Sequence, residues 1–245
     1  MNHEQRLKLI SRAWGRNQKG YCFFPWIDRE AQRKAGKRRA GYHEGEAFYW
    51  PRDRAEILVH MKEHEDHDLY WCPSLFEYPA RREDVAMDEH ALWADLDEAD
   101  PAEIEDYPPT VAWETSPGRW QALWIISSGD IQGASWPGNE NQRLTYHLGA
   151  DLGGWDTTQL LRLPAWKNHK YDSTPIGQVL WHNGRTYLSD DFEDLPKVRG
   201  AVASDIAGAL EKEIEAIDRL KVIGRVKLKL NHKARELLGA RAASG

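Results

Sequence analysis

Two aspartates separated by one residue, Asp95 and Asp97, are the clearest candidates in this sequence for chemistry. They end an apolar stretch, residues 90–97, which predicts a β-strand that runs into an acidic turn. Residues two apart in a strand project from the same face, so the two carboxylates are expected side by side. Adjacent carboxylates repel unless a cation lies between them, and Mg²⁺ and Mn²⁺ prefer oxygen ligands. A solvated acidic strand end is the alternative interpretation.

A second candidate is the turn Ser116-Pro117-Gly118, which joins two apolar segments predicted to form a β-hairpin. Such a turn exposes backbone N–H groups, and Arg119 adds a fork-shaped donor suited to phosphate. Gln121 follows on the second strand, where its amide can donate to a phosphate without carrying charge. A tight hairpin with no binding role is the alternative.

An aspartate after a predicted helix and an arginine inside an apolar strand are two further candidates. Asp151 precedes a double glycine, which is also the usual setting of a turn residue. Arg162 lies where an unpaired charge is costly, so an anionic group is expected to meet it. Asn168 and Lys170 follow in a loop. A structural arginine in a salt bridge, followed by a solvated loop, is the alternative.

Three histidines, His60, His64 and His67, have the spacing that places metal ligands on one helix face. Their charged neighbours favour a solvated helix end instead. No phosphate-binding P-loop motif occurs in the sequence. With only two cysteines, a disulfide framework and a four-cysteine zinc site are both excluded.

The elements that must position these groups predict an α+β fold. Helices are predicted at residues 4–14, 53–64, 139–151, 201–221 and 231–243. Strands are predicted at residues 20–27, 46–50, 68–76, 90–100, 109–115, 119–126, 160–166 and 177–183. The basic segment 28–45 is expected to be a mobile loop.

Composition indicates a globular chain of 245 residues, with 41% hydrophobic and 29% charged residues. The net charge of −6 hides a strong segregation, because residues 1–54 carry +7 and residues 55–110 carry −14. Such a chain suits a protein that binds cations in one place and phosphates in another. No apolar run suggests a membrane span or a secretory signal, so a reducing cytoplasm is expected.

The order of the four candidate segments resembles the archaeo-eukaryotic primase superfamily, specifically the plasmid- and phage-type primase-polymerases that include RepB-type replication primases. The resemblance runs from about Leu69 to Lys170. It implies that the catalytic and metal-binding residues are Asp95, Asp97 and Asp151. It also implies that the nucleotide-binding residues are Ser116, Arg119, Gln121, Arg162, Asn168 and Lys170.

The chain departs from the pattern of that family at two positions. Gln121 stands where the second motif usually ends in His, and Gln cannot carry a positive charge, although Arg119 can replace it. Ala165 stands where Gly often follows Pro in the last segment. Neither change touches the carboxylates, so the expected metal site is unaffected.

The resemblance implies an α+β primase fold with an RRM-like antiparallel sheet core, an N-terminal α/β unit and a C-terminal helical segment. The expected domains are a catalytic domain over residues 1–200 and a helical accessory segment or linker over residues 201–245. The implied function is that of a DNA primase or DNA-directed polymerase, a nucleotidyltransferase that starts or extends strands on a single-stranded DNA template. Two Mg²⁺ or Mn²⁺ ions and nucleoside triphosphates are the implied cofactors and substrates.

Basic residues 29–39 and the basic C-terminal helices are expected to follow the template backbone. A helicase domain or another replication protein is the expected further partner, in the cytoplasm of a bacterial host of a plasmid, phage or other mobile element. A catalytically inactive module that binds single-stranded nucleic acid is the alternative. A replication-initiator nuclease would need a His-x-His pair, which the sequence lacks.

Overall fold

The computed structural model describes residues 1–198, except residues 38, 89, 98, 128–136, 174 and 182–183. Almost all described residues belong to one compact unit, Met1–Lys197. The predicted helices at 201–221 and 231–243 lie outside the described residues, and so does the predicted domain boundary after residue 200. No helix in the described part of the chain combines the length and apolarity that a membrane crossing requires.

The described unit contains four α-helices and ten β-strands. The helices are α1 (His3–Ile10), α2 (Arg29–Ala35), α3 (Arg54–Glu63) and α4 (Pro137–His147). The strands are β1 (Gly20–Phe23), β2 (Trp26–Ile27), β3 (Tyr42–His43), β4 (Ala47–Trp50), β5 (Asp68–Trp71), β6 (Ala91–Asp97), β7 (Val111–Ser116), β8 (Arg119–Ile125), β9 (Leu161–Arg162) and β10 (Val179–Trp181). The short 3₁₀ turns are Glu83–Val85, Pro101–Glu103 and Ser189–Phe192.

The central sheet has the strand order β10-β7-β8-β6, and every neighbouring pair is antiparallel. Strands β7 and β8 form the predicted hairpin, in which Ala112 pairs with Ala122. The Glu114 carboxylate accepts a hydrogen bond from the backbone N–H of Gly118 at 2.8 Å, and Gly118 adopts a positive φ of 73°. The turn needs glycine because that backbone conformation is costly for other residues. The α+β class and the hairpin are therefore confirmed.

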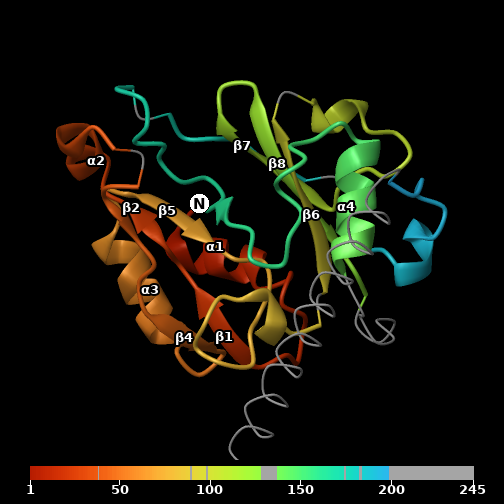
Figure 1. The fold of residues 1–245 in the computed structure, drawn as a ribbon, viewed down its shortest axis with the longest axis horizontal. Coiled ribbons are helices and arrows are strands. Elements are labelled where there is room, and N and C mark those ends of the chain that lie inside the picture. The colour runs from red at the N-terminus through yellow and green to blue at the C-terminus, as the bar shows by residue number, and fades with distance from the viewer. Residues whose placement is uncertain are drawn as a thin grey trace, which may run out of the picture. The chain divides into compact units, whose positions relative to one another are not determined.

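Both faces of the central sheet are buried, and each face belongs to a different apolar core. Along β6, Trp93 packs into one core with Trp113, whereas Leu92 and Ala94 pack into the other with Leu144 of α4. Figure 1 shows α4 along β6 on one side of the sheet and α1 on the other. A strand that is buried on both faces reads as a continuous apolar run, which is why residues 91–94 are all apolar.

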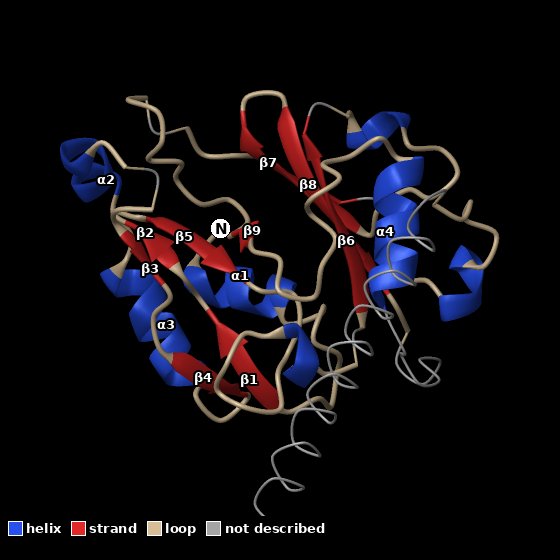
Figure 2. Ribbon diagram, in the orientation of Figure 1, coloured by secondary structure: helices blue, strands red, loops and turns tan. Residues whose placement is uncertain are grey.

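The N-terminal part of the chain builds the layer that covers the other face of the central sheet. Its four strands have the order β3-β2-β5-β9, and β1 pairs with β4 in a separate antiparallel ribbon. Strand β9 joins the two layers, because it pairs with β5 while the backbone N–H of Arg162 donates to the side chain of Gln121 on β8. Figure 2 shows β9 beside β5.

Two expectations about these elements are wrong. Residues 29–35 form a helix rather than a mobile loop: Asp28 caps it by accepting from the N–H of Ala31, and Gly36 ends it with a positive φ of 63°. This helix buries no residue, so it has no apolar periodicity that the sequence could display. Strand β9 spans two residues rather than seven, because Pro164 cannot donate to a strand and Ala165 turns the chain with a φ of 53°.

Candidate active site

Strand β6 ends in a β-bulge that sets the direction of the two aspartates. Asp95 pairs with Gln121 of β8, whereas Asp97 pairs with Trp120. Two steps along β6 therefore correspond to only one step along β8. Asp97 has a positive φ of 50°, which is uncommon for a residue other than glycine. The simple alternation expected from the sequence is therefore interrupted at Leu96 and Asp97. Bulges of this kind re-aim side chains and occur often beside active sites.

The loop after α4 brings Asp151 to the same strand end. Gly149 leaves the helix with a φ of 65°, and the backbone N–H of Asp151 then donates to the carbonyl of Asp95 at 2.9 Å. The Asp151 carboxylate accepts from the N–H of Gly153 at 3.0 Å, which fixes its direction. A Cβ added at Gly154 would lie 3.5 Å from the Cβ of Asp95, so this loop packs directly on the first aspartate. The structure thus brings residues 95 and 151 together.

Burial and negative charge together perturb Asp95. Burial, with a smaller contribution from the nearby carboxylates of Asp97 and Asp151, raises the pKa of Asp95 to about 6. The Gln121 amide, which donates to Asp95 Oδ2 at 3.3 Å, acts against this rise. Asp97 is partly neutralised by Arg119, whose Nη1 lies 2.5 Å from Asp97 Oδ1. The site therefore holds an excess of negative charge at the buried aspartate.

The donor set has the chemistry that a hard divalent cation requires. Three carboxylates supply only oxygen ligands, and a cation would relieve the repulsion that raises the pKa of Asp95. The arrangement is not preformed: among the described residues, no group of three or more His, Cys, Asp or Glu side chains is placed to hold a metal. The Asp97 carboxylate faces Arg119 instead.

Gln121 connects the carboxylate site to strand β9. Its side chain is 5% exposed, its Nε2 donates to Asp95, and its Oε1 accepts the backbone N–H of Arg162 at 2.9 Å. An amide can donate and accept at once, whereas a protonated histidine can only donate. Gln121, which stands where the resembled family usually has His, thus makes two hydrogen bonds inside the protein.

Arg162 is 6% exposed, and its guanidinium is committed to the buried carboxylate of Asp68. Its Nη1 lies 2.8 Å from Asp68 Oδ1, and its Nη2 donates to the Tyr70 hydroxyl at 2.9 Å. Arg29 of α2 pairs with the other oxygen of Asp68 at 2.5 Å. Burial acts to raise the pKa of Asp68, but the positive charges and hydrogen bonds of Arg162 and Arg29 outweigh burial and lower this pKa. The interpretation as a structural salt bridge therefore fits Arg162, and sequence reasoning missed its partners Asp68 and Arg29.

Asn168 and Ser116 are also buried, at 3% and 5% exposure, whereas Lys170 is exposed. Asn168 Nδ2 donates to the carbonyl of Thr115 at 2.8 Å, and its Oδ1 accepts from the backbone N–H of Lys170 at 3.2 Å. These bonds attach the loop after β9 to the hairpin that carries Arg119. Of the six predicted nucleotide-binding residues, only Arg119 and Lys170 present their charged groups to solvent.

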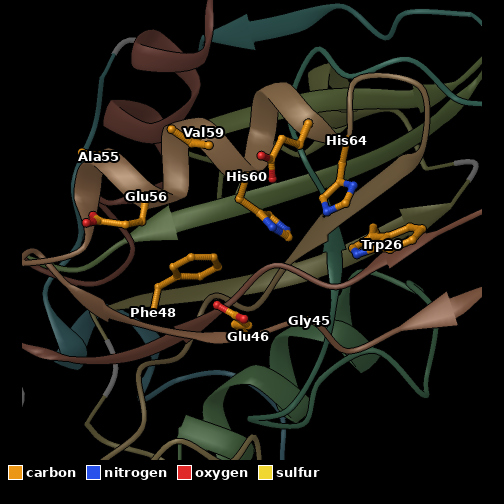
Figure 3. A pocket seen from close by; sticks show the side chains of 10 residues that line it. Trp26, Gly45, Glu46, Phe48, Ala55, Glu56, Val59, His60 and His64 are labelled. Atoms are coloured by element: carbon orange, nitrogen blue, oxygen red, sulfur yellow. The ribbon is translucent and has the colours of Figure 1, made fainter.

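The histidines of α3 form an aromatic cluster away from the carboxylates. Trp26 is stacked between His43 and His64, with ring centroids 3.9 Å and 4.4 Å away. Burial, followed by the neighbouring histidines, lowers the pKa of His64 to about 4. His60 and His64 line a cavity of about 510 Å³ with Trp26 and Phe48, as Figure 3 shows. The charged neighbours of these histidines are exposed, as expected for a solvated helix end, whereas His60, His64 and His67 are half-buried. None of the predicted site residues lines this cavity.

Comparisons with known proteins bear on the family and on the fold. Residues 73–187 match the family described as RepB DNA-primase N-terminal domain. The AEP domain of the cyanophage S-2L primase-polymerase has a TM-score of 0.55, with 14% identity over 80% of this chain and 98% of that one. The crystal structure of primase RepB′ has a TM-score of 0.50, with 20% identity over 90% of this chain and 69% of that one. These two likenesses show a common fold.

A third structure is the catalytic domain of primase RepB′ in complex with initiator DNA. Its TM-score is 0.48, with 19% identity over 86% of this chain and 97% of that one. A search of curated proteins finds no match to the chain.

Proposed function

We propose that the chain is a metal-dependent nucleotidyltransferase that starts or extends strands on a single-stranded DNA template. The match of residues 73–187 to the RepB DNA-primase N-terminal domain family supports this proposal. One observation carries the proposal. Asp95, Asp97 and Asp151 come from one strand end and one loop, and the charges of Asp97 and Asp151 lie close enough to add to burial in raising the pKa of Asp95 to about 6. A site with such perturbed carboxylates is a candidate for catalysis.

Asp95, Asp97 and Asp151 are the residues that would hold Mg²⁺ or Mn²⁺. Two such ions, when bound, stabilise the attacking and leaving oxygens of an in-line displacement at phosphorus. Asp95 is already oriented by Gln121 and by the backbone of the bulge. Asp97 now pairs with Arg119 and would have to leave this ion pair to hold a metal, which would release the guanidinium for a phosphate.

Arg119 and Lys170 are proposed to bind the triphosphate, because both are exposed cations at the edge of the site. Ser116, Gln121, Arg162 and Asn168 were expected to touch the nucleotide as well. Because these four are buried, three of them in internal hydrogen bonds, we assign them positioning roles instead. The exposed basic side chains of α2, Arg33 and Lys34, are proposed to follow the template backbone.

The remaining partners are proposed by family resemblance. These are nucleoside triphosphates and a helicase domain or another replication protein, in the cytoplasm of a bacterium that carries the plasmid or phage.

Incorporation of labelled nucleotides on a single-stranded template tests the proposal. The parent protein is expected to incorporate nucleotide with Mn²⁺ or Mg²⁺, and the double variant Asp95→Asn, Asp151→Asn is expected to lose this activity. Glu103→Gln is the matched control, because Glu103 is an exposed carboxylate of the same acidic region. Equal incorporation by the parent and the double variant would refute the site.

A module that binds nucleic acid without catalysis is the second candidate. The ion pair between Asp97 and Arg119 favours it, since this pair occupies a carboxylate that the metals need. Binding of a labelled single strand with no incorporation in either metal would establish the binding module and reject the polymerase.

A further inference from the structure

A second pocket, of about 440 Å³, opens where the turn after α1 meets the end of β8. It is lined by Ser11, Arg12, Gly15, Arg16, Trp50, Ile125, Ile126, Ser127 and Thr186. Two of these residues are arginines, three carry hydroxyls, and none of the described lining residues is acidic. In a protein with a net charge of −6, this is a local positive site.

The lining groups are those that recognise a phosphate and an adjoining base. Guanidinium groups bind phosphate oxygens through paired N–H donors, and Arg16 is exposed while Arg12 is partly buried. Ser127 donates to the Thr186 hydroxyl at 3.1 Å, which places two hydroxyl groups together at the rim.

Trp50 supplies a fixed aromatic wall. It ends β4, pairs in the backbone ladder with Gly20, and packs against buried Trp14 with ring centroids 5.1 Å apart. The indole is nevertheless partly exposed, so one part of the ring is available to a ligand. Bases of any sequence stack on aromatic side chains, and each such contact is worth about 1–3 kcal/mol.

The pocket lies at the opposite end of β8 from the carboxylates. Gln121 touches Asp95, and Ile125 lines the pocket, so four residue steps of one strand separate the two places. At roughly 3.4 Å per residue this is about 14 Å. Because β8 is buried on both faces between these two residues, a nucleic-acid strand that reaches both places must pass around the sheet.

We propose that this pocket binds a phosphate and the adjoining base of a single-stranded nucleic acid. That the bound strand continues to the carboxylates rests on the proposed function, whereas the pocket itself does not. The region of residues 55–110 carries −14 and repels a polyanion, so a strand that reaches Asp95 needs an anchor elsewhere. The arginines and Trp50 supply that anchor.

Fluorescence anisotropy with a labelled oligothymidine of about 12 nucleotides tests the pocket. The measurement is made in EDTA, with the parent and with the double variant Asp95→Asn, Asp151→Asn, so that binding is separated from catalysis. Arg16→Glu is expected to weaken binding about tenfold in both backgrounds and to reduce the slope of log affinity against log salt by about one. Arg16 is exposed, so this variant is expected to fold.

Arg82→Glu is the matched control, because it makes the same charge change at an exposed arginine outside the pocket. Photocrosslinking of an iodouracil-substituted oligonucleotide is expected to label Trp50. Unchanged binding by Arg16→Glu, or an equal loss in Arg82→Glu, would overturn the proposal. If Arg16→Glu loses binding but the parent protein incorporates no nucleotide, the nucleic-acid-binding pocket is supported and the proposed polymerase activity is refuted.

Discussion

The side chain of Gln121 donates to Asp95 and accepts the backbone N–H of Arg162, so it links the acidic strand end to the neighbouring layer. Gln121→Met keeps the volume but removes both hydrogen bonds. The buried N–H of Arg162 then has no acceptor, which is expected to lower the free energy of unfolding by about 1–3 kcal/mol. Urea denaturation of the parent and the variant measures this difference. A loss below about 0.5 kcal/mol would show that water replaces the amide.

Asp95→Asn is expected to stabilise the metal-free protein at neutral pH while it abolishes nucleotide incorporation. The pKa of Asp95 is raised to about 6 in the folded protein. Its contribution to the free energy of unfolding is therefore fully present at a pH below the pKa of an unfolded aspartate, and it is lost as the pH rises through about 6. With a shift of about two units, the charged carboxylate costs on the order of 3 kcal/mol near pH 7. The variant does not bear this cost. Denaturation in EDTA at several pH values should show the advantage vanish below about pH 4, and a difference independent of pH would contradict the burial argument.

Mn²⁺ is expected to raise the melting temperature of the parent, because a ligand that binds only the folded state stabilises it. The double variant Asp95→Asn, Asp151→Asn should show no such rise, whereas Glu103→Gln should behave like the parent. Calorimetric titration with Mn²⁺ provides the independent affinity. A rise of equal size in all three proteins would place the binding elsewhere.

Arg119→Gln is expected to change metal and nucleotide binding in opposite directions. Arg119 pairs with Asp97 at 2.5 Å, so its removal frees a carboxylate for the metal and should strengthen Mn²⁺ binding severalfold. The same change removes a proposed donor to the triphosphate, so KM for the nucleotide should rise about tenfold, as for the loss of a charged hydrogen bond. Titration with Mn²⁺ and steady-state kinetics measure the two effects. A weaker affinity for both ligands would show that Arg119 supports the fold of the site instead.

Asp68→Asn is expected to lower the free energy of unfolding by about 3–5 kcal/mol, because it leaves two partly or fully buried guanidinium groups without a counterion. Those groups belong to Arg29 and Arg162. The pKa of Asp68 is lowered in the folded protein, so its contribution to the free energy of unfolding is present at neutral pH. This contribution is lost as the pH falls through the pKa that Asp68 has in the folded protein.

Glu30→Gln removes the exposed pair with Lys34 and serves as the control, with a much smaller loss of stability expected because solvent screens this pair. Urea denaturation at neutral pH compares the two variants. Losses of similar size would mean that the Asp68 pair does not stabilise the fold.

The local patterns of the sequence determined the hairpin of β7 and β8, the strand that carries Asp95 and the helix that precedes Asp151. Each depends on residues close in the chain: Gly118 closes the turn, and Gly149 ends the helix. The order of the acidic and basic motifs was equally visible, and it pointed to the primase family that residues 73–187 match.

Only the tertiary structure decided which charges meet. Arg162 pairs with Asp68, 94 residues away, and Gln121 bonds to Asp95 across neighbouring strands, 26 residues away. The bulge at Asp97 depends on the register between β6 and β8, and the sequence of either strand alone does not determine this register. The physical reason is that the sign and spacing of charges along a chain do not specify their partners. Burial and register select them once the layers have packed.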